Sequence, residues 1–276
     1  MSLPLLLKMR EERAAVLALC TDVNDFAVKQ AKPAAYFGPK PVSTQEQMLF
    51  AVLEGFLQRH VSLFGAMLSL EKSGFRAEWL ILSRTLFELA SDCEFFWNEV
   101  VTSENPATVL ERIRYSWNQN NFHLLKESKN VSEEQIELLR DKIKKVDGLT
   151  KKEHEDIKNK QNFMGLNLRE RANKYSSGNL YKPVYSRLSK YTHGMTYDEE
   201  MRFAENKSEE KFQIVRISEE ILNLYHGGML VMDALKNLSA VTMRQIDRPV
   251  MNELQLRFEN VLPSTASAEI TKPIDD

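Results

Sequence analysis

Three long stretches of this chain carry apolar residues at alternating spacings of three and four. They cover residues 43–74, 75–102 and 211–240. In the last stretch the apolar positions are Ile214, Ile217, Ile221, Leu224, Gly228, Val231, Leu235 and Leu238. This spacing is typical of helices that pack lengthwise on other helices. We therefore predict an all-α protein, a bundle of long antiparallel helices.

The other two stretches have comparable apolar seams. In the first, the seam consists of Leu49, Leu53, Phe56, His60, Leu63, Met67 and Leu70. In the second it consists of Trp79, Leu82, Leu86, Leu89, Cys93, Phe96 and Val100. Many neighbours of the second seam are also apolar, so this helix is expected at the centre of the bundle. Gly227 and Gly228 fall inside the third helix, where each costs about 1 kcal/mol relative to alanine. A close helix crossing would offset that cost.

Prolines, glycines and charge divide the remaining chain. Residues 1–42 are expected to form an N-terminal helix, at about 8–30, and a proline-rich loop. Residues 43–262 are expected to form one helical domain, opened by a capping box of Ser43 and Glu46 and closed by a helix near 245–262. Within this domain, a charged helical excursion is predicted over 104–175, with helices near 106–128 and 131–160. The polar tail, 263–276, is predicted to be disordered.

Composition narrows the classes of function. The net charge is −2, so any attraction for nucleic acid has to come from a local basic patch. Two cysteines, Cys20 and Cys93, argue against a disulfide framework, and Cys93 is expected to be a buried thiol. No stretch approaches the roughly 18 apolar residues of a membrane span. We therefore expect a soluble, cytoplasmic protein without membrane partners.

A local basic patch does occur. Residues 165–190 carry six basic residues and one acidic residue, a net charge of +5, with tyrosines between them. Basic charge beside aromatic rings can hold phosphates and stack bases. The residues predicted to bind RNA are Arg169, Arg171, Lys174, Lys182 and Lys190.

A short helix is predicted over 180–193, ended by Gly194 as its C-cap. Ser189 and His193 are four apart and share a face of this helix. Arg187 and His193 are six apart, roughly 120° around an ideal helix. These two side chains converge only if the helix ends or bends there, or if a second chain supplies the partner. In the helix at 75–102, Arg84 and Glu88 lie four apart and are expected to form a paired, buried network.

The segments S-R-T-L-F-E, 83–88, and Y-S-R-L-S-K-Y-T-H, 185–193, together resemble the HEPN superfamily, and an uncharacterised bacterial HEPN-like family in particular. The resemblance implies a metal-independent endoribonuclease that needs no cofactor. It implies a homodimer in which paired protomers bring two Arg–His motifs to one cleft. His193 would be the acid/base and Arg187 would stabilise phosphoryl charge, with Arg84, Glu88, Ser189 and Tyr185 in support. Active members often have a polar residue after the arginine, where this chain has Leu188.

HEPN relatives often act as toxins or phage-defence effectors, so a cognate inhibitor or defence-system partner is a further expectation from the resemblance. A non-catalytic HEPN-like module that binds RNA or protein is the alternative. In that case Arg187 and His193 would cap a helix or join two helices. The sequence contains no metal-binding motif and no nucleotide-binding or hydrolase motif. Of the other histidines, His60 and His226 are expected to be satisfied core residues, and His123 and His154 to be exposed.

Overall fold

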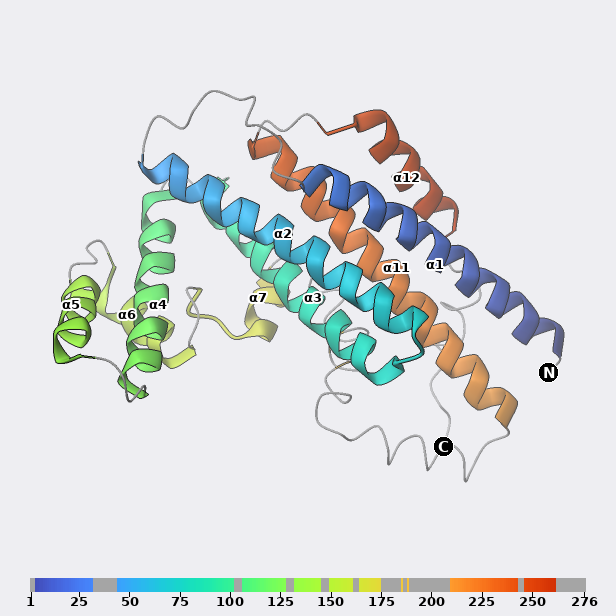
Figure 1. Ribbon diagram of the computed structural model, residues 1–276, viewed down its shortest axis with the longest axis horizontal. Coiled ribbons are helices and arrows are strands. Elements are labelled where there is room, and N and C mark those ends of the chain that lie inside the picture. The colour runs from blue at the N-terminus through green and yellow to red at the C-terminus, as the bar shows by residue number, and fades with distance from the viewer. Residues whose placement is uncertain are drawn as a thin grey trace. The chain divides into compact units, whose positions relative to one another are not determined.

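The fold comes from a computed structural model, which describes residues 3–31, 44–101, 106–127, 132–144, 149–160, 164–174, 185, 188, 209–242 and 246–261. Within these ranges all regular structure is helical, which confirms the all-α prediction (Figure 1). The proline-rich loop, the Ser43 cap, most of the predicted 180–193 helix and the tail lie outside the described residues. No helix in the described ranges has the length and apolar character needed to cross a membrane.

The helices are α1 (Leu3–Ala31), α2 (Thr44–Lys72), α3 (Arg76–Phe96), the π-helix η1 (Trp97–Val101), α4 (Pro106–Glu127), α5 (Glu133–Lys144), α6 (Lys151–Lys160), α7 (Leu168–Lys174), α11 (Glu209–Thr242) and α12 (Arg248–Asn260). The prediction of a single charged helix near 131–160 is therefore wrong, because two helices, α5 and α6, lie in that stretch. A capping box starts the second of them: Thr150 N donates to Glu153 Oε2 at 2.7 Å, and Glu153 N donates to Thr150 Oγ1 at 3.3 Å.

The chain forms two compact units, one of residues 1–40, 53–90 and 180–276 and the other of 41–52 and 91–179. Helices α2 and α3 contribute residues to both. The domain boundaries drawn from the sequence stay a prediction.

In the first unit, α1 contacts both α2 and α11. It runs antiparallel to α2, since Ala31 O accepts from Gln58 Nε2 while Arg13 pairs with Glu71. It runs parallel to α11, since Arg13 pairs with Glu220 and Cys20 Sγ lies 3.1 Å from Leu224 O. Figure 1 shows these three helices side by side, with α12 against α1 and α11. The bundle therefore mixes parallel and antiparallel neighbours.

The predicted core is confirmed most fully along α11. All the predicted seam positions of this helix whose side chains are described are buried. In α2 the buried face is centred about one residue further on than predicted, so Phe56, Leu63 and Leu70 are only half-buried. The buried residues of α2 are Leu53, Leu57, His60, Val61, Phe64, Met67, Leu68 and Glu71. Cys93 is a buried free thiol, as predicted, and burial raises its pKa to about 12.

The glycine pair of α11 marks a close helix crossing, as the sequence predicts. A Cβ atom added at Gly228 would lie 2.4 Å from Cζ of Phe258 in α12, a distance that requires Phe258 to move. A Cβ atom at Gly227 would lie 3.0 Å from Cε of Met67 and 3.2 Å from Cε2 of Phe64, both in α2. Two helices thus approach α11 closely at adjacent positions.

Gly228→Ala is expected to destabilise the protein by about 1–3 kcal/mol, because the added methyl group overpacks the contact with Phe258. The loss should appear in chemical denaturation despite alanine's better helix propensity. Gly55→Ala in α2 is the matched control, because no atom lies within 4 Å of its Cβ position. This control is expected to stabilise by up to about 1 kcal/mol. Equal gains in stability in Gly228→Ala and Gly55→Ala would show that α12 does not pack on Gly228.

In the second unit, α4 packs with α5, α6 and η1. Its small apolar cluster consists of Tyr115, Ile157, Ile143 and Leu149. α5 has no buried residue and carries ion pairs such as Lys144–Asp141 at 3.7 Å, as expected for a solvated charged segment. His154 is half-buried rather than exposed, since its ring packs edge-on against Tyr115 with the centroids 4.4 Å apart.

Candidate functional site

A polar cluster joins α3 to the segment that carries the predicted motif. Arg84 Nε donates to Glu88 Oε1 at 3.0 Å, and Arg84 Nη2 donates to the Tyr185 hydroxyl at 2.9 Å. The guanidinium carbon also lies 4.9 Å from the centroid of the Tyr185 ring, within cation–π range. Phe87 flanks the same ring, with the centroids 5.7 Å apart. Arg84, Glu88 and Tyr185 thus form one contact group, called here the Arg84 cluster.

The predicted Arg84–Glu88 pair is confirmed, but it is not fully buried. The side chains are 18% and 36% exposed, because they lie at the edge of the face that buries Leu86 and Phe87. Burial, and then the charge of Glu88, raise the pKa of Tyr185, so the hydroxyl stays protonated. Arg84 Nη1 is buried with no hydrogen-bond partner among the described residues. An unpaired buried donor costs about 1–3 kcal/mol, so this nitrogen is open to a further acceptor.

Leu188 is the second described residue of the motif segment, and it is fully buried. The position that directly follows Arg187 is therefore part of the hydrophobic core. Together, Tyr185 and Leu188 attach the segment to the packed part of its unit. Arg187, Ser189 and His193 lie outside the described residues, as do Lys182 and Lys190.

The other predicted RNA-binding residues belong to α7. Arg169 is exposed, and the side chain of Arg171 is not among those described. Lys174 forms an ion pair with Glu99 of η1, and its Nζ lies 5.5 Å from the centroid of the Phe95 ring. Lys174 is thus already bound to protein groups, which the sequence did not predict.

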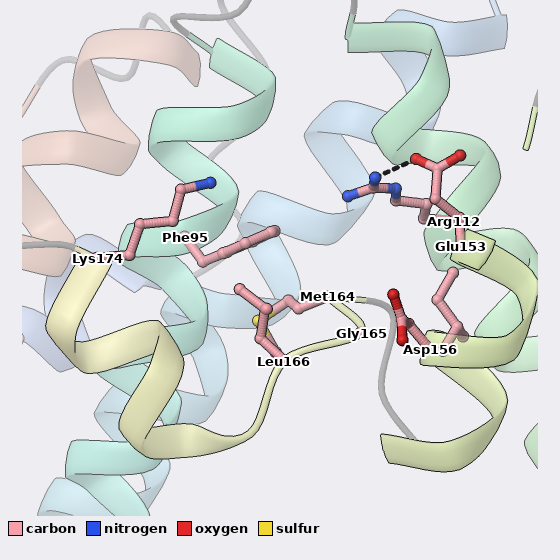
Figure 2. A pocket seen from close by; sticks show the side chains of 9 residues that line it. Phe95, Arg112, Glu153, Asp156, Met164, Gly165, Leu166 and Lys174 are labelled. Carbon is pink, nitrogen blue, oxygen red and sulfur yellow. Dashed lines mark hydrogen bonds and ion pairs between the residues drawn. The ribbon is translucent and has the colours of Figure 1, made fainter. Parts of the chain in front are cut away.

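Lys174 also lines a pocket of about 190 Å³ within the second unit (Figure 2). On another wall of this pocket, Arg112 forms an ion pair with Glu153. Burial raises the pKa of Glu153, but hydrogen bonds from Arg112 and Thr150 outweigh it and lower the pKa to about 2. Arg112 Nε is buried without a partner among the described residues. Two basic and two acidic side chains line this pocket, so it has no excess of either charge.

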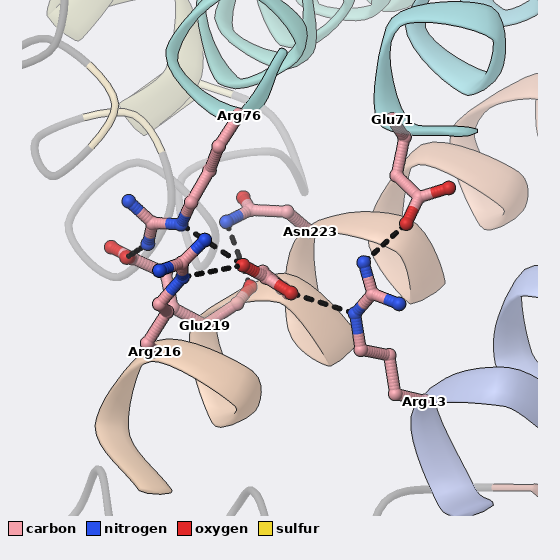
Figure 3. Close-up of polar contacts among 7 residues, drawn as sticks. Arg13, Glu71, Arg76, Arg216, Glu219 and Asn223 are labelled. Carbon is pink, nitrogen blue, oxygen red and sulfur yellow. Dashed lines mark hydrogen bonds and ion pairs between the residues drawn. The ribbon is translucent and has the colours of Figure 1, made fainter. Parts of the chain in front are cut away.

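A larger ionic network, which the sequence did not predict, lies in the first unit (Figure 3). Glu220 of α11 accepts hydrogen bonds from Arg13 Nε at 2.6 Å, Arg76 Nε at 3.0 Å and Arg216 Nε at 3.2 Å. Arg13 also pairs with Glu71, and Arg76 with Glu219 at 2.8 Å. The network joins α1, α2, α3 and α11. The available sequence signal was Glu220, an acidic residue on the apolar face of α11.

The sequence of residues 50–211 matches the model of DUF5677, a family of unknown function. These residues make up more than half of the chain. The chain belongs to this family. No curated protein and no solved structure matches it.

The DUF5677 region runs from within α2 to the start of α11 and includes Arg84, Glu88 and Tyr185. It also includes Arg187 and His193. Arg13 and Glu220 of the ionic network lie outside it. The DUF5677 match carries no link to the HEPN superfamily, so that resemblance stays a prediction. Within the described ranges, no group of histidine, cysteine, aspartate and glutamate residues is arranged to hold a metal ion.

Proposed function

We propose that this DUF5677 protein is a HEPN-like, metal-independent endoribonuclease that uses Arg187 and His193. The observation that supports the proposal is the contact between Arg84 and Tyr185, at 2.9 Å. It joins the two segments on which the resemblance rests, although they are 101 residues apart in the chain. Arg84 and Glu88 would hold the motif segment in place, and Arg84 Nη1 has capacity for one more acceptor.

The proposed reaction is attack of a ribose 2′-hydroxyl on the adjacent phosphate. The 2′ oxygen–phosphorus bond forms while the bond to the 5′ oxygen breaks, which leaves a 2′,3′-cyclic phosphate. His193 exchanges the protons, since histidine titrates near neutral pH. Arg187 stabilises the charge that builds on the phosphoryl oxygens. In the homodimer that we propose, each protomer brings its motif to a shared cleft, because the two side chains diverge on a single ideal helix.

The proposed cellular role is that of a toxin or phage-defence effector, held in check by a cognate inhibitor or a defence-system partner. This part of the proposal rests on the HEPN resemblance alone. Induced expression is then expected to stop growth, and His193→Ala to relieve the arrest.

The decisive assay uses purified protein on total cellular RNA in the presence of EDTA. Cleavage is expected, with 2′,3′-cyclic phosphate ends, and DNA is expected to remain intact because it lacks the nucleophile. His193→Ala should abolish cleavage and keep most RNA binding, while Arg187→Ala should weaken both. His123→Ala, at an exposed histidine of α4, is the matched control and should cleave normally. Cleavage that needs magnesium, or that persists in His193→Ala, would rule out this mechanism.

A non-catalytic RNA- or protein-binding module is the second candidate. The full burial of Leu188 favours it, because active HEPN members often have a polar residue at that position. In the same assay, this candidate predicts no cleavage by the native protein or by either variant.

A further inference from the structure

Four arginine side chains line a pocket of about 380 Å³ in the first unit. Its charged lining consists of Arg10, Arg13, Arg76, Arg216, Glu71 and Glu220. This group is called here the arginine pocket. Four arginines and two glutamates face one partly enclosed space, and a third glutamate, Glu219, pairs with Arg76 beside it, so positive charge remains in excess by one. A pocket lined mainly by one sign of charge concentrates counter-ions.

Two of the guanidinium groups lie close together in the pocket. Arg76 Nε and Arg216 Nε both donate to the same atom, Glu220 Oε1, at 3.0 and 3.2 Å. Figure 3 shows the guanidinium groups of Arg76 and Arg216 next to each other. Two positive charges that share one oxygen repel each other. A bound anion in the pocket would offset this repulsion.

Donors in the pocket also remain available. Within the described part of the chain, Arg216 donates only through Nε, which leaves its two Nη atoms without a protein partner. Arg10 is exposed at the same pocket and has no ion pair with the described residues. Guanidinium groups match phosphate oxygens with two parallel hydrogen bonds. The free donors and the excess positive charge are thus of the kind that recognises an oxyanion.

We infer that the arginine pocket binds a phosphate group, with Arg10 and Arg216 as the residues that contact it. The volume lies within the range of small-molecule sites, so a phosphate ester fits as well as the bare ion. Trp79 and Ile217 supply an apolar wall for the organic part of such an ester. None of these residues belongs to the Arg84 cluster, so this inference does not depend on ribonuclease activity.

The test is isothermal titration calorimetry of the full chain with two probes, inorganic phosphate and adenosine monophosphate, at constant ionic strength set with chloride. Binding of at least one probe is expected. Arg216→Gln and Arg10→Gln are each expected to weaken it at least about tenfold, since each removes charge-assisted hydrogen bonds. Adenosine without phosphate is expected not to bind. If adenosine monophosphate binds and phosphate alone does not, the pocket requires the organic part of an ester.

Arg257→Gln is the matched control. Arg257 resembles Arg216 in having one ion pair and a similar exposure, 43% against 41%, but it pairs with Asp22 outside the pocket. The Arg257→Gln variant should bind the probes as the native protein does. Circular dichroism should show that all variants are folded. No heat with either probe would overturn the inference, as would equal weakening in Arg216→Gln and Arg257→Gln. RNA cleavage is measured separately, so the two proposals can fail independently.

Discussion

Glu220→Gln is expected to destabilise the protein by about 3–5 kcal/mol, one of the two largest effects that the structure indicates. Glu220 is buried and accepts hydrogen bonds from three arginines on three helices. The amide keeps the shape but removes the only charge that all three arginines share. Because the arginines are partly exposed, water offsets some of the repulsion, and the lower end of the range is expected. Urea denaturation at pH 7 measures the change.

The control for Glu220→Gln is Glu137→Gln in α5, which breaks an exposed ion pair with Arg140. Such pairs contribute at most about 1 kcal/mol. The double variant Glu220→Gln, Arg216→Gln is expected to lose less stability than the two single variants together. Without Glu220 the arginines repel one another, and removing Arg216 takes away one of the repelling charges. A loss below about 0.5 kcal/mol for Glu220→Gln would show that the network does not hold the four helices together.

Protonation of His60 is expected to give the second large effect, a loss of stability on acidification. His60 is fully buried in α2 and its Nδ1 hydrogen-bonds to Phe56 O at 2.8 Å, while Nε2 has no partner among the described residues. Burial lowers its pKa from 6.5 to about 4, and the bond to Phe56 only partly opposes this. The unfolded chain therefore binds a proton that the folded protein excludes. Stability is retained above pH 6.5 and falls between 6.5 and about 4, by on the order of 3 kcal/mol.

The measurement is the free energy of unfolding in urea at pH 7, 6, 5 and 4, for the native protein and for His60→Leu. Other groups titrate in both proteins, so the difference between the two curves isolates His60. Between pH 7 and pH 4, the free energy of unfolding of the native protein should fall by about 3 kcal/mol relative to that of His60→Leu. His123→Gln, at an exposed position, controls for the loss of a histidine as such. A difference between the native protein and His60→Leu that does not vary with pH would mean that His60 is not buried in solution.

The sequence predicted those features that depend on near neighbours in the chain. The seam of α11 and the pair of Arg84 with Glu88 both follow from helical periodicity, since residues three or four apart share a face. The close crossing at Gly228 followed from the cost of glycine in a helix. The capping box that starts α6 has a sequence signal, Thr150 followed three residues later by Glu153. We did not assign it, because the surrounding residues are mostly charged and resemble one continuous helix.

The ionic network could not be predicted in the same way. Arg13 and Glu220 are 207 residues apart, and nothing in either segment specifies the other as its partner. Their contact depends on how α1 lies on α11. The buried face of α2 was misplaced for a related reason, because a helix that touches neighbours on several sides buries more than one stripe. His60 was expected in the core, but its unpaired Nε2 depends on which side chains surround it.

The parallel contact between α1 and α11 has a consequence for how the chain folds. Cys20 and Leu224, which meet across it, are 204 residues apart. A ribosome adds about 5–20 residues per second, so roughly 10–40 s pass between the synthesis of α1 and of its partner. α2 can cover one side of α1 early. The side toward α11, which includes Cys20, stays exposed until α11 has been made, so α1 is expected to dock late and to be the part of the nascent protein most in need of a chaperone.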